Sequence, residues 1–394
     1  MKIAIVYGDW CLSFRKTLEL TTARADPRGL SGSEYGYIRI AEELAKLGHE
    51  VTAYTTSADA GKAHEGVRIA DLAGPIEPCD AFVSVNEPDQ GRRAPAGAFR
   101  VALQWVNDMS YLKRGVAAHV DLWCSPSEAH RQKYLTEPSW RRIEVSPEHP
   151  EGAETYVPDP SKWCTIPLGC DPERLGPHDV GPYALSLSRE KVPGRVVYCS
   201  SPDRGLHWLL QEWPAIKTAV PHATLRIFYR LAPWLRGWDA TPHFPAIEPL
   251  RKRALYIEEC LRRFAALGGM GVTVCDSVSR DVIEEEMSVA ECLAYPCQTT
   301  TWSEGFSCTI LECCAAQACP VITDCDALGE VYAAIDPVPM QGDWLKAWRE
   351  RVILALTDPV FRADVNAKAR KLSEDLTWKR TAERLAAEIE RRKK

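Results

Sequence analysis

The sequence predicts an α/β protein built from two Rossmann-like domains, each with a parallel sheet. At 394 residues the chain is longer than one typical hydrophobic core requires, so two domains are expected. Residues 2–7 (KIAIVY) and 195–199 (RVVYC) are apolar runs of strand length, as buried parallel strands are. A glycine-containing loop and then a helical pattern follow each run, which indicates a βαβ unit in each half.

Composition excludes several classes of protein. The chain is 45% hydrophobic and 26% charged, as ordinary globular domains are. Its net charge of −6 argues against a protein built mainly to bind nucleic acid. No apolar window is long enough to span a membrane, and the first residues are typical of a strand rather than a signal peptide. We therefore expect a cytoplasmic protein.

The fifteen cysteines raise the question of metal ligands or disulfides. No C-x-x-C pair occurs, and the nine histidines are not spaced near cysteines as zinc ligands are. Many cysteines lie in apolar runs, for example Cys275, Cys292 and Cys319. We predict buried free thiols and no metal site.

The N-terminal half follows the βαβ pattern in order. Residues 29–34 (GLSGSE) form a glycine loop, a helix follows, and residues 51–54 make the next strand. Further strands are predicted at 81–85, 101–105 and 122–124. The loop lacks G-x-G-x-x-G, so a classical dinucleotide site is not expected. Gly32 is either a ligand-facing glycine or a packing glycine.

Two irregular stretches set the predicted domain boundaries. Residues 136–163 hold five prolines and are an insertion or a flap, whereas residues 172–194 are rich in proline and glycine. We predict an N-terminal domain over 1–178, a linker over 179–194 and a second domain over 195–374. A last helix is predicted over 375–394, and its ERRKK end is assigned to a solvated face.

In the second domain, the loop 200–205 (SSPDRG) joins the first strand to a helix. Arg204 could hold a diphosphate through two parallel hydrogen bonds. The alternative is that Arg204 pairs with Asp203 or with a helix end. The basic residues of the helix over 250–267 could meet an anionic partner, but the pattern favours a solvated face.

Residues 295–332 contain the strongest functional signal. A turn at 304–307 (EGFS) opens a helix from about 308 to 317, with Ser307 as the expected N-cap. Such a helix start presents free N–H groups to an anion, while Glu304 and Glu312 can accept from sugar hydroxyls. The pattern therefore indicates a sugar phosphate or nucleotide sugar. The alternative is that the two glutamates cap and solubilise an ordinary helix.

Glu304 and Glu312 stand in an E-x7-E spacing, followed by PVI at 320–322 and by Glu330. This block resembles glycosyltransferase family 4, and so do LAKLGHEV at 44–51 and CTIPLGCD at 164–171. The resemblance implies the GT-B fold, in which two Rossmann-like domains face a central cleft. In this fold the last helix, here 375–394, often crosses back to the first domain. It also implies a retaining hexosyl- or pentosyltransferase that uses a nucleotide-diphosphate sugar and requires no metal or other cofactor.

The resemblance implies a role for each site residue. Glu304 contacts the transferred sugar, Glu312 binds the ribose, and Gly32 lies near the donor phosphates and the acceptor. The diphosphate is assigned to Arg204 and to the backbone N–H groups near Phe306, Ser307 and Cys308. Ser201 and Gly305 are further expected donor-binding residues.

Three positions depart from the family pattern. Asn107, followed by Asp108, replaces a histidine that holds the transferred sugar, although an amide can also bond a hydroxyl. Ser200 lies where a first cation is usual, and Gln317 where glycine is usual, so the helix must pack differently there. A catalytically idle sugar-nucleotide-binding module, a phosphorylase or an epimerase therefore stay open as alternatives.

The sequence leaves the donor base, the sugar, the acceptor and the oligomeric state undetermined. An acceptor in nucleic acid is disfavoured by the acidic net charge.

Overall fold

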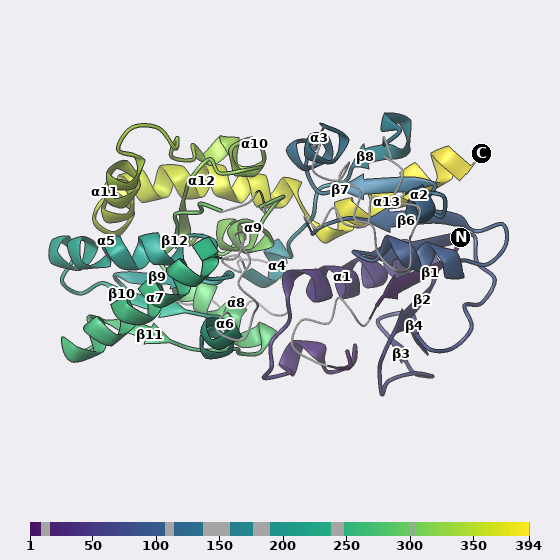
Figure 1. Ribbon diagram of the computed structural model, residues 1–394, viewed down its shortest axis with the longest axis horizontal. Coiled ribbons are helices and arrows are strands. Elements are labelled where there is room, and N and C mark those ends of the chain that lie inside the picture. The colour runs from purple at the N-terminus through teal and green to yellow at the C-terminus, as the bar shows by residue number, and fades with distance from the viewer. Residues whose placement is uncertain are drawn as a thin grey trace. The chain divides into compact units, whose positions relative to one another are not determined.

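The computed structural model describes residues 1–8, 16–106, 114–136, 158–175, 190–237, 248–299, 302 and 304–393 (Figure 1). The chain divides into two compact units. Unit 1 comprises Met1–Arg24, Leu30–Gly169 and Leu376–Lys394, and unit 2 comprises Ala25–Gly29 and Cys170–Asp375. The change from unit 1 to unit 2 thus falls before the linker expected at 179–194, most of which lies outside the described residues.

Unit 1 is an α/β domain around an eight-stranded sheet in the order β3-β4-β2-β1-β5-β6-β7-β8. All neighbouring strands run parallel except β3 and β4. The strands are β1 Lys2–Tyr7, β2 Glu50–Thr55, β3 Ala63–His64, β4 Val67–Asp71, β5 Ala81–Val85, β6 Phe99–Leu103, β7 Leu122–Ser125 and β8 Trp163–Thr165. The helices are α1 Gly32–Lys46, η3 Pro88–Arg93, α2 Arg114–Ala117, α3 Glu128–Thr136, η6 Pro160–Lys162 and α13 Trp378–Lys393, and the short η2 Ala23–Ala25 spans the boundary with unit 2.

Unit 2 holds a five-stranded parallel sheet in the order β11-β10-β9-β12-β13. Its strands are β9 Arg195–Tyr198, β10 Thr224–Ile227, β11 Val272–Val274, β12 Cys292–Tyr295 and β13 Cys319–Ile322. Its helices are α4 Pro172–Leu175, α5 Leu206–Ala219, α6 Leu231–Gly237, α7 Glu248–Ala266, α8 Arg280–Val289, α9 Cys308–Ala315, α10 Leu328–Val331, η7 Ala333–Ile335, α11 Trp344–Thr357 and α12 Pro359–Asp375. The predicted α/β class with parallel sheets is confirmed in both units.

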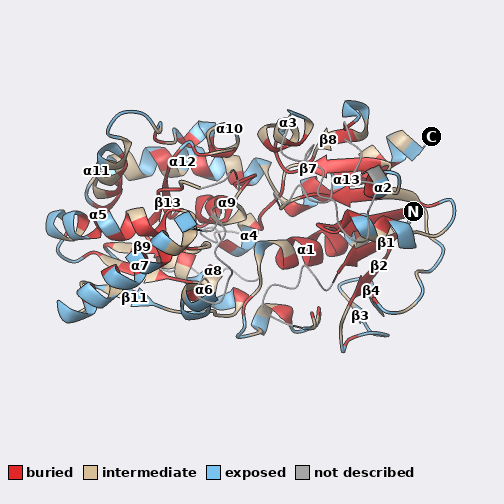
Figure 2. Cartoon of the chain, in the orientation of Figure 1, coloured by how far each residue is buried: buried red, intermediate tan, exposed pale blue. Residues whose placement is uncertain are grey.

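Burial explains why the strands read as continuous apolar runs (Figure 2). In β1 every residue after Lys2 is buried, because helices cover both faces of a parallel sheet. A hydrophobic core cluster lies beside β7 and β8, where the rings of Trp123 and Trp163 stack at 5.1 Å and Tyr134 packs on Trp163 at 5.2 Å. Truncating a buried tryptophan such as these to alanine costs about 3–5 kcal/mol.

Helix α13 is the last helix of the chain, yet it packs on α1 within unit 1 (Figure 1). The Trp378 ring lies edge-on to Tyr35, with ring centroids 6.4 Å apart. A Cβ at Gly36 would lie 2.9 Å from Cη2 of Trp378, so only glycine lets the two helices approach this closely. The Thr381 hydroxyl also donates to the Pro167 carbonyl at 2.8 Å.

Fourteen cysteines lie in the described part of the chain, and each is a free thiol. Cys292 and Cys319 are buried as predicted, whereas Cys275 is only half-buried. No group of three or more His, Cys, Asp or Glu side chains among the described residues could hold a metal ion. Over the same residues no helix has the length and apolar character needed to cross a membrane.

Candidate functional site

The candidate site lies at the carboxyl ends of β9 and β12 in unit 2. The strand order of this sheet reverses between these two strands, since β9 pairs with β10 on one side and with β12 on the other. In open parallel sheets, ligands bind in the crevice outside the carboxyl ends at such a reversal. The loop 199–205 follows β9, and the segment 296–307 follows β12, so both predicted halves of the site meet here.

A glycine lets these two loops touch. Gly205 precedes α5 with a φ of 99°, in the left-handed region that residues with a Cβ rarely adopt. A Cβ at this position would clash with the Pro296 carbonyl, which lies just after β12. The approach of the two loops therefore depends on glycine, and it places Arg204 beside Glu304.

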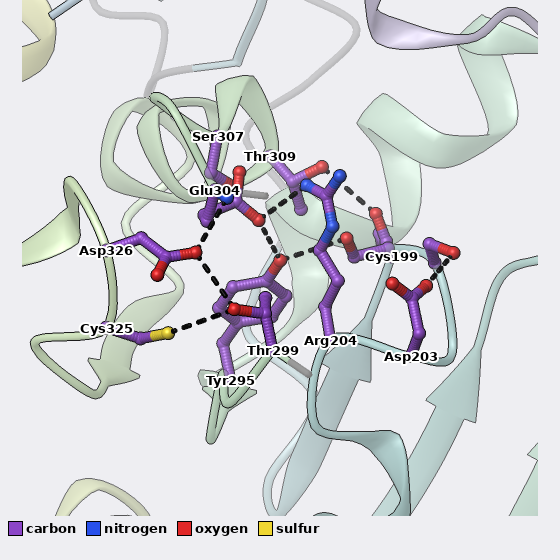
Figure 3. A network of polar contacts seen from close by, with 12 residues as sticks. Cys199, Asp203, Arg204, Tyr295, Thr299, Glu304, Ser307, Thr309, Cys325 and Asp326 are labelled. Carbon is purple, nitrogen blue, oxygen red and sulfur yellow. Dashed lines mark hydrogen bonds and ion pairs between the residues drawn. The ribbon is translucent and has the colours of Figure 1, made fainter. Parts of the chain in front are cut away.

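Arg204, Tyr295 and Glu304 form the centre of the site (Figure 3). Nη1 of Arg204 donates to Oε2 of Glu304 at 2.7 Å, and the Tyr295 hydroxyl donates to the same oxygen at 2.6 Å. Burial, and secondarily the Glu304 charge, raise the pKa of Tyr295 well above its ordinary value, so the hydroxyl keeps its proton. Glu304 itself is only 2% exposed and is not a solvated helix residue.

Arg204 does not pair with Asp203 or with a helix end, which were the alternatives considered from the sequence. Asp203 accepts a hydrogen bond from the Ser201 hydroxyl, while Arg204 forms its ion pair with Glu304. Nε of Arg204 is buried and has no hydrogen-bond partner in the described part of the chain. A buried orphan donor costs about 1–3 kcal/mol, which an anionic ligand accepting from it would offset.

Asp326 holds the backbone of Glu304 in place through a hydrogen bond. Its Oδ2 accepts from the Glu304 backbone N–H at 2.9 Å and from the Thr299 hydroxyl at 3.0 Å. The Ala327 N–H in turn donates to the Glu304 carbonyl at 3.1 Å. Asp326 has a φ of 53° and fixes the turn that presents Glu304. Nothing in the spacing of the sequence singled it out.

The start of α9 differs in part from the prediction. Ser307 occupies the N-cap position, but it has a φ of 71° and its hydroxyl makes no capping bond, so the predicted side-chain cap is wrong. Its carbonyl instead accepts from the Tyr332 hydroxyl at 2.6 Å, and the buried Phe306 packs against the Tyr332 ring. Burial raises the pKa of Cys308, so its thiol stays neutral beside the buried Gly305 turn.

Glu312 lies further along α9 in a separate ion pair. One of its carboxylate oxygens accepts from Nη2 of Arg280, whose Nε donates to Glu284 at 3.0 Å. Glu312 is 2% exposed, and burial raises its pKa despite the opposing effect of Arg280. Both glutamates of the E-x7-E spacing are therefore buried and paired, and the helix-solubilising alternative is wrong for each.

Arg253 links the two loops of the site. From α7, its Nη1 donates to the Asp203 carbonyl at 2.7 Å and to the Gln298 carbonyl at 2.8 Å. The Trp208 indole N–H donates to the Gln298 side chain at 2.7 Å. The prediction that the basic residues of this helix only face solvent is wrong for Arg253, because its partners lie far away in sequence.

In unit 1, Gly32 is the first residue of α1, and a capping box formed by Ser31 and Glu34 caps the N-terminus of this helix. Ser31 Oγ accepts from the Glu34 N–H at 3.2 Å, and the Glu34 carboxylate accepts from the Ser31 N–H at 2.6 Å. A Cβ at Gly32 would meet nothing within 4 Å, so the packing role is not supported. The space beside Gly32 is open.

Asn86 organises the carboxyl edge of the unit 1 sheet. Its Oδ1 accepts from the N–H groups of Trp105 and Val106 at 2.8 and 3.2 Å, and its Nδ2 donates to the Ser33 hydroxyl at 3.1 Å. It thereby fixes the chain that leads into the predicted site residue Asn107. Asn107 and the adjacent Asp108 lie outside the described residues.

Comparisons with known proteins identify the fold. No protein-family model and no curated protein sequence matches the chain. Among solved structures, AviGT4, a glycosyltransferase of avilamycin A biosynthesis, is 16% identical with a TM-score of 0.59, covering 99% of this chain and 97% of that one. Sucrose-phosphate synthase from Thermosynechococcus elongatus is 12% identical with a TM-score of 0.64, covering 99% and 98%.

Anabaena Alr3699/HepE, whose structure is a complex with UDP and glucose, is 12% identical with a TM-score of 0.60, covering 99% of both chains. At these identities the similarity establishes the fold. The chain has the GT-B fold of these glycosyltransferases, as predicted, and membership of family 4 stays a prediction.

Proposed function

We propose that the chain is a retaining hexosyl- or pentosyltransferase that uses a nucleotide-diphosphate sugar as donor. The observation that carries this proposal is the Arg204–Glu304 pair at the reversal of the unit 2 sheet, with an unused buried N–H on Arg204. The GT-B fold shared with known glycosyltransferases supports sugar transfer in general.

The leaving diphosphate needs positive charge and hydrogen-bond donors. The unused Nε–H of Arg204 supplies one, and the backbone N–H groups of residues 306–308 at the start of α9 supply others. The Ser201 hydroxyl lies on the same loop as Arg204, although it bonds to Asp203 in this structure. Charge that develops on the diphosphate is thus stabilised at the moment that the glycosidic bond breaks.

The two glutamates hold different parts of the donor in this proposal. Glu304 contacts hydroxyls of the transferred sugar, and Arg204 and Tyr295 fix the orientation of its carboxylate. Glu312 binds the ribose through the oxygen that Arg280 does not use. The acceptor hydroxyl attacks from the face that the diphosphate leaves, and a donor phosphate oxygen takes its proton, so no protein nucleophile or metal is required.

A catalytically idle nucleotide-sugar-binding module is the second candidate. Ser200, which lies where a first cation is usual, bonds to the Tyr295 hydroxyl at 3.0 Å. Glu304 Oε2 already accepts from two donors, which leaves less of the carboxylate free for a sugar. These contacts favour a stable, preorganised site and do not by themselves require turnover.

A ligand panel tests the proposal. Nucleoside diphosphates and nucleotide sugars are screened for a rise in melting temperature, since a ligand at a hundred times its Kd stabilises the native state by about 2.7 kcal/mol. Consumption of a stabilising donor supports the transferase, and protection of an intact donor supports the binding module. If no nucleotide of the panel stabilises the chain, both are wrong.

Two variants then separate the glutamates. Glu312→Gln should weaken binding of the free nucleoside diphosphate by roughly ten- to a hundredfold, because a charged hydrogen bond to ribose is lost. Glu304→Gln should leave that affinity unchanged and lower kcat, because contacts to the transferred sugar strengthen only in the transition state. If Glu304→Gln instead weakened binding of the nucleoside diphosphate and Glu312→Gln lowered kcat, Glu304 would be assigned to the ribose and Glu312 to the transferred sugar.

A further inference from the structure

A pair of thiols in unit 1 lies outside the proposed site. Cys124 on β7 and Cys164 on β8 are direct partners in the parallel register of these neighbouring strands. Their sulfurs are 3.6 Å apart and share a hydrogen bond. Neighbouring strands lie about 4.7–4.9 Å apart. That spacing falls within the Cα separations of roughly 4.4–6.8 Å that disulfides span.

The two thiols differ in access. Cys124 is 1% exposed, whereas Cys164 is half-buried and reaches the surface. β8 is also the edge strand of its sheet and only three residues long. A reagent can therefore reach Cys164 first, and Cys124 lies directly behind it.

The charges around the pair favour a thiolate on Cys164. Its hydrogen bond with Cys124 lowers the pKa of Cys164, and the nearby guanidinium groups of Arg391 and Arg392 on α13 lower it further, against burial and the Glu388 carboxylate. Burial raises the pKa of Cys124 well above its ordinary value. Cys164 thus has the character of an attacking thiol and Cys124 that of a resolving thiol.

The other cysteines that the structure describes lack this combination. Burial raises the pKa of Cys79 and of Cys275, both of which are half-buried. Cys325 has a lowered pKa through its hydrogen bond with Cys297, but unlike Cys164 it is buried, at 8% exposed.

We propose that Cys164 and Cys124 form a thiol-oxidation site that reacts with low-molecular-weight disulfides such as oxidised glutathione. The Cys164 thiolate attacks one sulfur of the reagent, whose S–S bond breaks and releases one glutathione thiolate. The Cys124 sulfur, after losing its proton to solvent, then attacks the Cys164 sulfur and releases the second glutathione. The protein dithiol loses two electrons and the reagent gains two, and the new bond ties the edge strand β8 to β7.

The test uses the full chain, which is incubated with oxidised glutathione, blocked with N-ethylmaleimide and digested without reductant for mass spectrometry. We expect a Cys124–Cys164 cross-linked peptide lighter by two hydrogens. In Cys124→Ser, Cys164 should accumulate as the mixed disulfide with glutathione. In Cys164→Ser, Cys124 should stay unmodified, and Cys79→Ser should behave as wild type.

Melting temperatures measured on each variant show that it is folded before labelling. The proposal is overturned if Cys79 or Cys275 reacts as fast as Cys164, or if Cys325 reacts first. It is also overturned if Cys124 is oxidised in Cys164→Ser at the wild-type rate, or if no cross-link forms while Cys164 carries glutathione. None of these outcomes depends on the proposed sugar transfer.

Discussion

The burial of the Arg204–Glu304 ion pair predicts the order of stability of variants that lack one or both of its charges. The Glu304 side chain is 3% exposed and the Arg204 side chain 27% exposed, with 2.7 Å between their charged atoms. In Arg204→Ala the Glu304 charge stays buried with the Tyr295 hydroxyl as its remaining donor. Loss of one partner of a buried pair costs about 3–5 kcal/mol, and we expect about 3 kcal/mol here because Tyr295 still donates.

Glu304→Gln should cost less, about 1 kcal/mol, since the amide oxygen still accepts and Arg204 has access to water. The double variant Arg204→Ala/Glu304→Gln contains no buried unpaired charge. It should therefore be more stable than Arg204→Ala alone, although it carries one more substitution. The predicted order of stability is wild type, Glu304→Gln, the double variant and then Arg204→Ala.

Urea denaturation followed by tryptophan fluorescence measures this order, and an unchanged slope m shows that the midpoint shifts report stability. Turnover of a donor, measured where every variant is folded, should fall by roughly two to four orders of magnitude in Arg204→Ala. It should not be restored in the double variant. Additive losses in the double variant would show that the two side chains are not coupled, and near-wild-type turnover without Arg204 would refute its role as diphosphate donor.

Three further predictions follow from single contacts. Gln317 follows the C-cap residue of α9 and has a φ of 55°. Gln317→Gly should therefore raise the free energy of unfolding in urea by about 0.5–1 kcal/mol, and Gln317→Ala should give no gain. Arg253→Ala should lower the free energy of unfolding by about 1.5–3 kcal/mol and weaken nucleotide binding. As a control, substitution of the exposed Arg262 on the same helix by alanine should change it by about 0.5 kcal/mol or less. Equal effects of the two substitutions would contradict the linking role of Arg253. Burial lowers the pKa of Lys191 from 10.5 to about 8, so between pH 8 and pH 10.5 the unfolded chain binds more protons than the folded one. The free energy of unfolding, measured relative to Lys191→Met, should therefore rise with pH across this window. A difference between the two proteins that does not change with pH would contradict the shift.

The sequence predicted strands and loop positions correctly wherever the local residue pattern agrees with the fold. Continuous apolar runs predicted the parallel strands, and loops at strand ends predicted where Arg204 and Glu304 would lie. Gln317 was identified as a departure from a usual glycine, and its left-handed backbone shows why glycine suits that position.

The remaining contacts depend on residues that are far apart in sequence. Arg253 meets carbonyl groups about fifty residues away on either side, and Arg280 meets Glu312 across 32 positions. Helical periodicity reports only neighbours within about one turn, so it assigned Arg253 to a solvated face. Ser307 failed as a side-chain cap because its backbone is left-handed, which no residue preference at that position predicted.

The path of the chain through the two units limits how the protein can be cut. It passes from one unit to the other after Arg24, Gly29, Gly169 and Asp375. A gene split after Gly169 would therefore yield a first polypeptide without α13, the helix whose Trp378 packs on Gly36. That polypeptide would need α13 supplied from the second fragment in trans. Since Met1–Arg24 and Leu376–Lys394 both belong to unit 1, deletion of either segment removes part of that unit.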